Sequence, residues 1–233
     1  MKRWLKAELH THTLEDPVDG RRIIFHSPRQ LIDTAAERGF EVLSITNHNQ
    51  LLFNDQLEEY ARSRGILLIP GVEATLKGKH VLLYNFPDYS PMWGDFEVVK
   101  QKKGCHQLVI APHPFFPTLT SLRRQLYRHR ELFDAIEYNH FYLNWLNFNK
   151  RGEDVARDLN LPVIGNSDVH RLFQLGCTYT LIRAEKDLNS VMKAIRDGEV
   201  ELVTRPVSAL FVSRWFALNA ASRSQFAFRS LLS

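Results

Sequence analysis

The chain has 233 residues and a mass of 27.1 kDa, enough for one large domain with a substantial hydrophobic core. Its two cysteines, Cys105 and Cys177, are too few for a disulfide framework and too far apart in sequence for a Cys-x-x-Cys metal site, and they favour a reducing compartment. No apolar run has the length of a signal peptide or reaches the roughly 18 residues of a membrane span. We therefore expect a cytoplasmic protein in which any metal is held by histidine and carboxylate.

The formal charge of +4 is unevenly distributed along the chain. Residues 206–233 contain three arginines and no acidic residue, so this tail carries +3 and residues 1–205 carry only +1. Basic stretches at residues 100–103 and 123–130 have the spacing typical of a solvated helix face. No aromatic RNA-binding motif accompanies them, so a nucleic-acid partner is not indicated.

Short apolar runs, several rich in β-branched residues, alternate with helical patterns. The runs predict strands at residues 5–9, 41–45, 66–70, 80–84, 108–111, 134–138, 162–165 and 178–182. The first helix begins with Ser27 as its N-cap and Pro28 at its first position, and it stops at Gly39. Further helices are predicted at residues 55–65, 121–133, 148–160 and 187–198.

This alternation predicts an α/β fold with a mainly parallel sheet, and about seven or eight units favour a barrel over an open sheet. One catalytic domain is expected over residues 1–205. The apolar tail, residues 206–233, is predicted as a helix that packs on the barrel or frays, with Leu210, Trp215 and Phe216 along one face.

Five of the ten histidines come shortly after a predicted strand. His10 and His12 follow the first strand and His48 the second, while a later Asp-Val-His contains Asp168 and His170. Glu73 and His113 follow two further strands. Strand ends of a parallel barrel converge on one face, so these residues would share a pocket.

The spacing within the two pairs strengthens a metal hypothesis. Side chains two residues apart in extended chain point the same way, so His10 and His12, like Asp168 and His170, can address one point. Imidazole with carboxylate suits Zn²⁺, Mn²⁺ or Fe²⁺. His80 begins a strand and joins the pocket only if that strand runs back toward it. The histidines outside this pattern are His26, His106, His129 and His140.

In this order, the motifs ELHTHT, SITNHN, GVEA with HVLLYNF, APHPFF and NSDVH resemble the PHP family, named for polymerase and histidinol phosphatase. The resemblance covers about residues 7–206. It implies a distorted seven-stranded (β/α)7 barrel with up to three divalent metals, Zn, Mn or Fe, at the C-terminal strand ends. The ligands it implies are His10, His12, His48, Glu73, His80, His113, Asp168 and His170.

A further ligand is implied from the long loop after the first motif. Asp19, in Val-Asp-Gly, matches the family pattern best, and His26 and Asp16 are the alternatives. The second motif departs from the family, because Asn47 stands where Asp is usual. Asn keeps a hydrogen bond but supplies no negative charge and no proton.

The implied activity is hydrolysis of a phosphate ester, a small phosphomonoester or nucleotide, by a hydroxide that bridges two metals. Glu73 would be the shared carboxylate, Asp168 or His140 would pass a proton, and Arg171 would contact the substrate phosphate. The alternatives are an exonuclease or nucleotide-bisphosphate phosphatase, and a metal-binding module without turnover. Asn47 is the residue that keeps the module alternative open.

Overall fold

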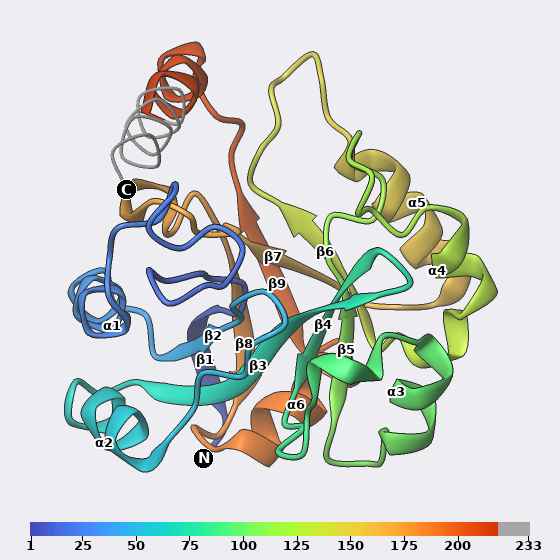
Figure 1. The fold of residues 1–233 in the computed structure, drawn as a ribbon, viewed down its shortest axis with the longest axis horizontal. Helices are drawn as coiled ribbons and strands as arrows, with labels where there is room; N and C mark the ends of the chain where they lie inside the picture. The colour runs from blue at the N-terminus through green and yellow to red at the C-terminus, as the bar shows by residue number, and fades with distance from the viewer. Residues whose placement is uncertain (219–233) are drawn as a thin grey trace, which may run out of the picture.

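The computed structural model describes residues 1–218, in which strands from both halves of the sequence form one curved sheet (Figure 1). Its neighbours run in the order β7-β6-β5-β4-β3-β2-β1-β8-β9. The strands are β1 Arg3–Glu8, β2 Val42–Ile45, β3 Leu67–Leu76, β4 Lys79–Tyr84, β5 Leu108–Ala111, β6 Ala135–Asn139, β7 Val163–Asn166, β8 Thr178–Ala184 and β9 Val200–Thr204. The eight predicted strands are all present, and β9 adds one that was not predicted.

The helices lie around the outside of this sheet, with α1 and α2 on one side and α3, α4 and α5 on the other (Figure 1). Ser27 caps the first helix as predicted, accepting a hydrogen bond from the Gln30 amide in a capping box. The helices are α1 Pro28–Glu37, α2 Asp55–Ser63, α3 Phe96–Lys102, α4 Arg124–Arg128, α5 Asn149–Leu159 and α6 Leu188–Arg196.

Two helical predictions need correction. The helix predicted at 121–133 is shorter, because α4 ends at Arg128 and a 3₁₀ turn, Arg130–Leu132, follows it. Helix α3 was not predicted, although Asp95 caps it and its basic end overlaps residues 100–103. The three lysines there pair with Glu131, Asp88 and Asp134, which makes this stretch a neutralised surface.

The sheet is mixed rather than mainly parallel. Parallel pairs join β1 to β2, β2 to β3, β5 to β6 and β6 to β7. Antiparallel pairs join β3 to β4, β4 to β5, β1 to β8 and β8 to β9. The structure is therefore an α/β fold with a nearly closed, barrel-like sheet, and its strands do not follow a simple (β/α)7 repeat.

A tight hairpin explains the first reversal. Lys77 and Gly78, the two residues between β3 and β4, both have positive φ, at 47° and 75°, as a type I′ turn requires. The register places Thr75 opposite His80. Since Glu73 lies two residues before Thr75 on the same face, His80 returns to the neighbourhood of Glu73.

The barrel closes through side chains where β7 meets β8 and β9. Thr180 Oγ1 accepts a hydrogen bond from the Gly165 amide at 2.8 Å and donates one to the Gly165 carbonyl at 2.9 Å. The backbones approach so closely that a Cβ on Gly165 would lie 2.4 Å from Leu202 Cδ1 and 2.9 Å from the Tyr179 carbonyl oxygen. Glycine is therefore required at this seam.

Part of the apolar tail packs on the barrel as a helix over residues 209–218. Its contact face is Phe211 and Trp215, whose rings lie 5.1 Å from Phe173 and 5.4 Å from Phe141. The prediction that Leu210 shares this face is wrong, since Leu210 is 77% exposed. The rest of the predicted tail, residues 219–233, lies outside the described residues.

Replacing Gly165 by alanine should destabilise the fold by about 2–3 kcal/mol, because the new Cβ meets backbone and packed side chains at the seam. The matched control is Gly152→Ala within α5, whose Cβ would meet only ordinary contacts at 3.6 and 3.8 Å. That helical substitution should be stabilising by about 0.5–1 kcal/mol. Urea unfolding of both variants measures the difference, and equal stabilities would contradict this account of closure.

Candidate metal centre

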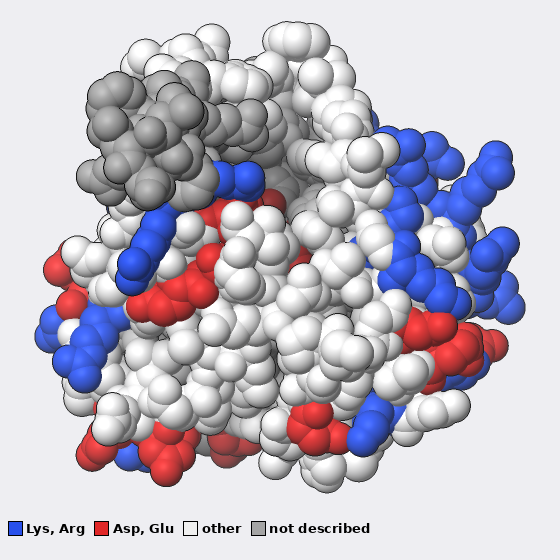
Figure 2. All heavy atoms as spheres, in the orientation of Figure 1, with Lys and Arg blue, Asp and Glu red and all other residues white. Residues whose placement is uncertain are grey.

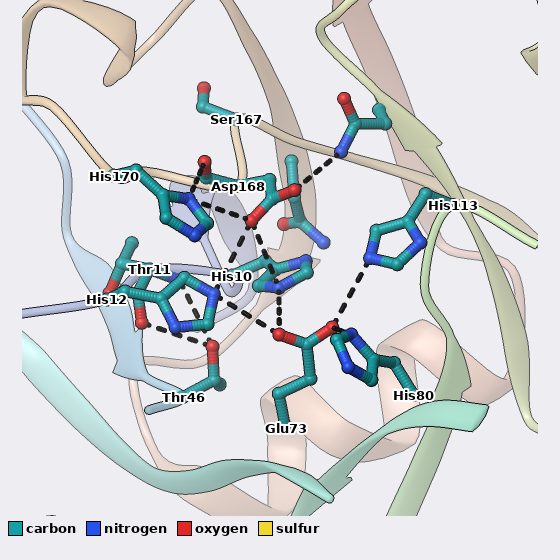
Figure 3. A network of polar contacts seen from close by, with 12 residues as sticks. His10, Thr11, His12, Thr46, Glu73, His80, His113, Ser167, Asp168 and His170 are labelled. Carbon is teal, nitrogen blue, oxygen red and sulfur yellow. Dashed lines mark hydrogen bonds and ion pairs between the residues drawn. The ribbon is translucent and has the colours of Figure 1, made fainter. Parts of the chain in front are cut away.

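Six histidines and two carboxylates meet at one end of the sheet. Figure 3 shows all of them except His48. His10 and His12 follow β1, His48 follows β2, and further members follow β5 and β7, as the sequence predicted. Glu73 differs from the prediction, because β3 continues to Leu76 and Glu73 lies inside this strand, while His80 lies in β4. The structure brings together His10, His12, His48, Glu73, His80, His113, Asp168 and His170. These residues therefore share a site, as the barrel argument predicted.

Glu73 lies at the centre of this cluster and is only 1% exposed. Its Oε2 atom lies 3.3 Å from His10 Nε2, 3.3 Å from His12 Nε2 and 3.1 Å from His48 Nε2. Its Oε1 atom lies 2.7 Å from His80 Nδ1 and 3.2 Å from His113 Nε2. One carboxylate therefore spans two groups of imidazoles.

Asp168 completes the cluster on the other side. Its Oδ1 atom lies 3.4 Å from the Nε2 atoms of His10 and His12 and 3.4 Å from His170 Nδ1. The Asn139 side-chain amide donates to the second oxygen, Oδ2, at 3.3 Å. Asp168 therefore contacts the same two imidazoles as Glu73, those of His10 and His12, from the opposite side.

Two buried carboxylates behind the cluster set the direction of its imidazoles. Asp16 Oδ2 accepts hydrogen bonds from the Nδ1 atoms of His12 and His48, both at 2.9 Å. Glu137 Oε1 accepts from His10 Nδ1 at 2.8 Å. With Nδ1 donating outward, each Nε2 faces Glu73 as a lone-pair donor.

The donor atoms at the centre fit a divalent cation. His10 Nε2 and His12 Nε2 are buried and have no hydrogen-bond partner, and each lies 3.3–3.4 Å from Glu73 Oε2 and Asp168 Oδ1. Four ligands about 2.1 Å from a tetrahedral ion lie about 3.4 Å from one another. Buried polar atoms without a partner are rare in folded proteins, and a shared cation supplies one here.

Charge balance leads to the same conclusion. The cluster and its surroundings contain five carboxylates, Asp16, Asp19, Glu73, Glu137 and Asp168. Among the described residues lining the adjacent cavity, Arg22 is the single Lys or Arg, and its guanidinium pairs with Asp19. Neutral imidazoles cannot offset so many buried negative charges, whereas two or three divalent cations can.

The environment keeps Glu73 anionic. Burial alone would favour its protonated form, but without a metal the positive charge of the neighbouring imidazoles when protonated, those of His80, His10 and His48 first, outweighs burial and holds the pKa of Glu73 well below its usual range. Backbone conformation also distinguishes this site, because His113 and Asp168 have positive φ, at 28° and 44°. Such strained conformations persist where the surrounding structure holds them, often at functional sites.

The three loop residues weighed as a further ligand occupy different places. Asp19 Oδ2 lies 3.3 Å from His170 Nε2, so Asp19 faces the cluster. Asp16 holds two imidazoles from behind, and its other oxygen accepts from the Val18 and Asp19 amides. His26 donates its Nε2–H to the His12 carbonyl at 2.8 Å, and burial lowers its pKa to about 4.

Asn47 is buried next to the cluster but contacts none of its imidazoles through a hydrogen bond. Its Oδ1 accepts from the Thr13 amide at 2.9 Å, and its Nδ2 donates to Thr13 Oγ1 at 3.0 Å. The carboxylate that orients His48 is Asp16. Asn47 therefore fixes the loop after β1, and the negative charge beside His48 is that of Asp16.

His140 lines the cavity beside the cluster. Gln174 Oε1 accepts from the His170 and Arg171 amides, so its Nε2 donates to His140 Nε2 at 3.2 Å and the ring proton belongs on Nδ1. Burial lowers the pKa of His140 to about 4, so the ring is neutral at pH 7. It therefore offers an N–H group rather than a cation.

Arg171 lies outside the cavity that contains the cluster. Its guanidinium stacks over Phe25 at 5.0 Å, donates to the Leu218 carbonyl and lines a neighbouring hollow that also contains Arg214. Arg171 was expected to contact the substrate phosphate, but the structure places its side chain on a different surface from the cluster. In the helices described over residues 1–218, none is long and apolar enough to cross a membrane.

Known proteins share this architecture. A family model described as PHP-associated matches residues 147–200, which include Asp168 and His170. A two-domain protein from Bacteroides vulgatus, described as containing a predicted PHP-like metal-dependent phosphoesterase, superposes with a TM-score of 0.70 at 21% identity. The match covers 88% of this chain and 66% of that one, so the chain spans just under two thirds of the two-domain protein. These findings show a fold shared with a PHP-like protein and a local match to the PHP-associated model.

Two further similarities extend over different lengths. PsfC from Pseudomonas syringae has a TM-score of 0.62 at 18% identity, over 96% of this chain and 99% of its own. An uncharacterized protein from Methanocaldococcus jannaschii is 27% identical over 130 residues, which is 53% of this chain and 75% of that protein. The fold therefore occurs in a solved protein of about the same length.

Asp16→Asn should weaken binding of divalent metal about 10–100-fold, because Asp16 orients His12 and His48 from behind. The number of metal ions bound per chain should stay the same. Competition against a chelating dye measures the affinity. The control is Asp154→Asn, an exposed carboxylate, which should change nothing. Loss of one equivalent of metal from a folded Asp16→Asn variant would instead make Asp16 a direct ligand.

Proposed function

We propose that the protein is a metal-dependent phosphoesterase that hydrolyses a small phosphate monoester. The observation that carries this proposal is the convergence of imidazole and carboxylate donors on Glu73 and Asp168, with two buried Nε2 atoms that lack partners. The residues that would hold the ions are His10, His12, Asp19, His48, Glu73, His80, His113, Asp168 and His170. The family resemblance supplies the reaction class.

Divalent ions at this site would polarise the phosphoryl group and make water a stronger nucleophile near neutral pH. The chain's own part is positioning. Glu73 and Asp168 face the same imidazoles from opposite sides, while Asp16 and Glu137 fix the ring orientations before substrate arrives. A site held this way requires little rearrangement during the reaction.

The cavity next to the cluster is suited to a small substrate. It has a volume of about 530 Å³, within the range of ordinary ligand pockets. His48, Glu73, His80, His113, Asp168 and His170 lie in its wall, so a bound molecule would contact the cluster directly. His140 would present a neutral side chain to that molecule. Either Asp168 or His140 is the group proposed to transfer a proton.

The two alternatives predict different behaviour. A module without turnover would bind metal and phosphate but release no product. An exonuclease or nucleotide-bisphosphate phosphatase needs cations for a second phosphate, yet Arg22 is the single Lys or Arg among the described lining residues. The composition of the cavity therefore favours a substrate with one phosphate.

Reconstitution with Mn²⁺, Zn²⁺ or Fe²⁺ should give release of inorganic phosphate from a panel of phosphate monoesters. His10→Ala should lower kcat/KM at least about 1,000-fold, because it removes a donor that faces both Glu73 and Asp168. His106→Ala is the control, since His106 is exposed and its ring contacts Asn189 away from the cavity. Metal-loaded protein inactive on the entire panel would favour the module.

A further inference from the structure

Aromatic side chains form two groups in the wall of the cavity that adjoins the cluster. Phe116, from the segment after β5, and Phe148, at the start of α5, have ring centroids 5.6 Å apart. Phe141, after β6, lies 5.4 Å from Trp215 of the C-terminal helix, and Trp215 lies 5.0 Å from Phe216. All five side chains line the cavity.

These rings have no role in binding metal or phosphate. Phe141, Phe148 and Trp215 are only partly buried in the described structure, so packing in the core leaves part of each ring accessible. Aromatic rings bind other flat rings by offset or edge-to-face contacts at centroid distances of about 4.5–7 Å. Their presence around a metal cluster indicates a substrate body that is flat and apolar.

The remaining wall of the cavity is polar but nearly without free charge. Thr118, Thr120, Asn139 and Gln174 are uncharged, and the Arg22 guanidinium pairs with Asp19. A second anionic group on the substrate, away from the cluster, would meet aromatic rings and hydroxyl groups instead of a cation. Leaving such a charge poorly compensated costs several kcal/mol.

The basic surface does not change this conclusion. Lys and Arg side chains gather along the right flank of the face shown in Figure 2, beside α4 and α5, while its middle is mostly uncharged. Arg123, Arg124, Arg128, Lys150 and Arg151 are exposed, and none of them lines the cavity. The cations are therefore outside the space that the substrate occupies.

We propose that the cavity takes a phosphate monoester of an aromatic alcohol, with its phosphate at the Glu73-centred cluster and one uncharged ring against the two groups of aromatic side chains. This inference rests on the proposed function. In the reaction, water forms the new P–O bond, the P–O bond to the aromatic alcohol breaks, and a proton from the water goes to the departing alcohol. The products are inorganic phosphate and the free alcohol, and the step needs no co-reactant besides water.

Calorimetry on the metal-loaded full chain tests the inference with phosphonates that cannot be hydrolysed. Phenylphosphonate should bind at least about tenfold more tightly than methylphosphonate, because two or more aromatic contacts contribute. Phe148→Ala and Trp215→Ala should each reduce that ratio to about threefold or less. Trp145→Ala is the matched control, since this exposed tryptophan is in the same loop as Phe141 but does not line the cavity.

The outcomes separate this inference from the proposed function. Equal binding of the two phosphonates, or an equal loss in the Trp145→Ala control, would overturn the aromatic substrate and leave a phosphoesterase. Adenosine 3′,5′-bisphosphate that binds more tightly than phenylphosphonate would overturn it in favour of a nucleotide with two phosphate groups. If neither phosphonate nor inorganic phosphate binds to metal-loaded protein, the proposed function fails as well.

Discussion

A buried carboxylate surrounded by imidazoles governs the organisation of this protein. Glu73 is 1% exposed and contacts five histidines that come from four separate segments of the chain. An isolated carboxylate in such a place would be protonated or strongly destabilising. The strand ends must therefore be positioned accurately, because each imidazole contributes to stabilising the charge of the Glu73 carboxylate.

The outer carboxylates explain how that accuracy is achieved. Asp16 links the loop after β1 to His48, which follows β2, and Glu137 links β6 to His10. Glu137 also accepts from the His113 amide at 2.9 Å and from the Asn166 side chain at 3.0 Å. Each of these carboxylates thus joins neighbouring parts of the barrel and orients a donor at the same time, so the site and the closure of the sheet stabilise each other.

Much of this site could be predicted because its residues follow local patterns. Pairs such as His10 and His12 stand directly after a recognisable strand, and the family motifs place the others. Glu137 was missed because it is inside an apolar run, although a glutamate within a buried strand is itself a signal of a paired charge. The position of Asp19 relative to Asp16 depends on loop geometry, which sequence spacing does not specify.

The fold was predicted less completely for reasons that concern long-range pairing. Lys77-Gly78 is a hairpin signal, and reading it as one would have predicted that β4 runs antiparallel to β3. The pairing of β1 with β8 joins distant segments, and nothing in either strand encodes the direction. Helix α3 is short and contains two adjacent valines, a composition that favours strand as much as helix.

The most direct test of the central claim is the metal content of the purified protein after loading with Mn²⁺ or Zn²⁺ and removal of free ions, measured by mass spectrometry. The account predicts two or three equivalents per chain in the wild type. It predicts fewer than one in a folded Glu73→Gln variant, since Glu73 contacts both groups of imidazoles. Wild-type protein without bound metal, or equal metal in the two proteins, would contradict it.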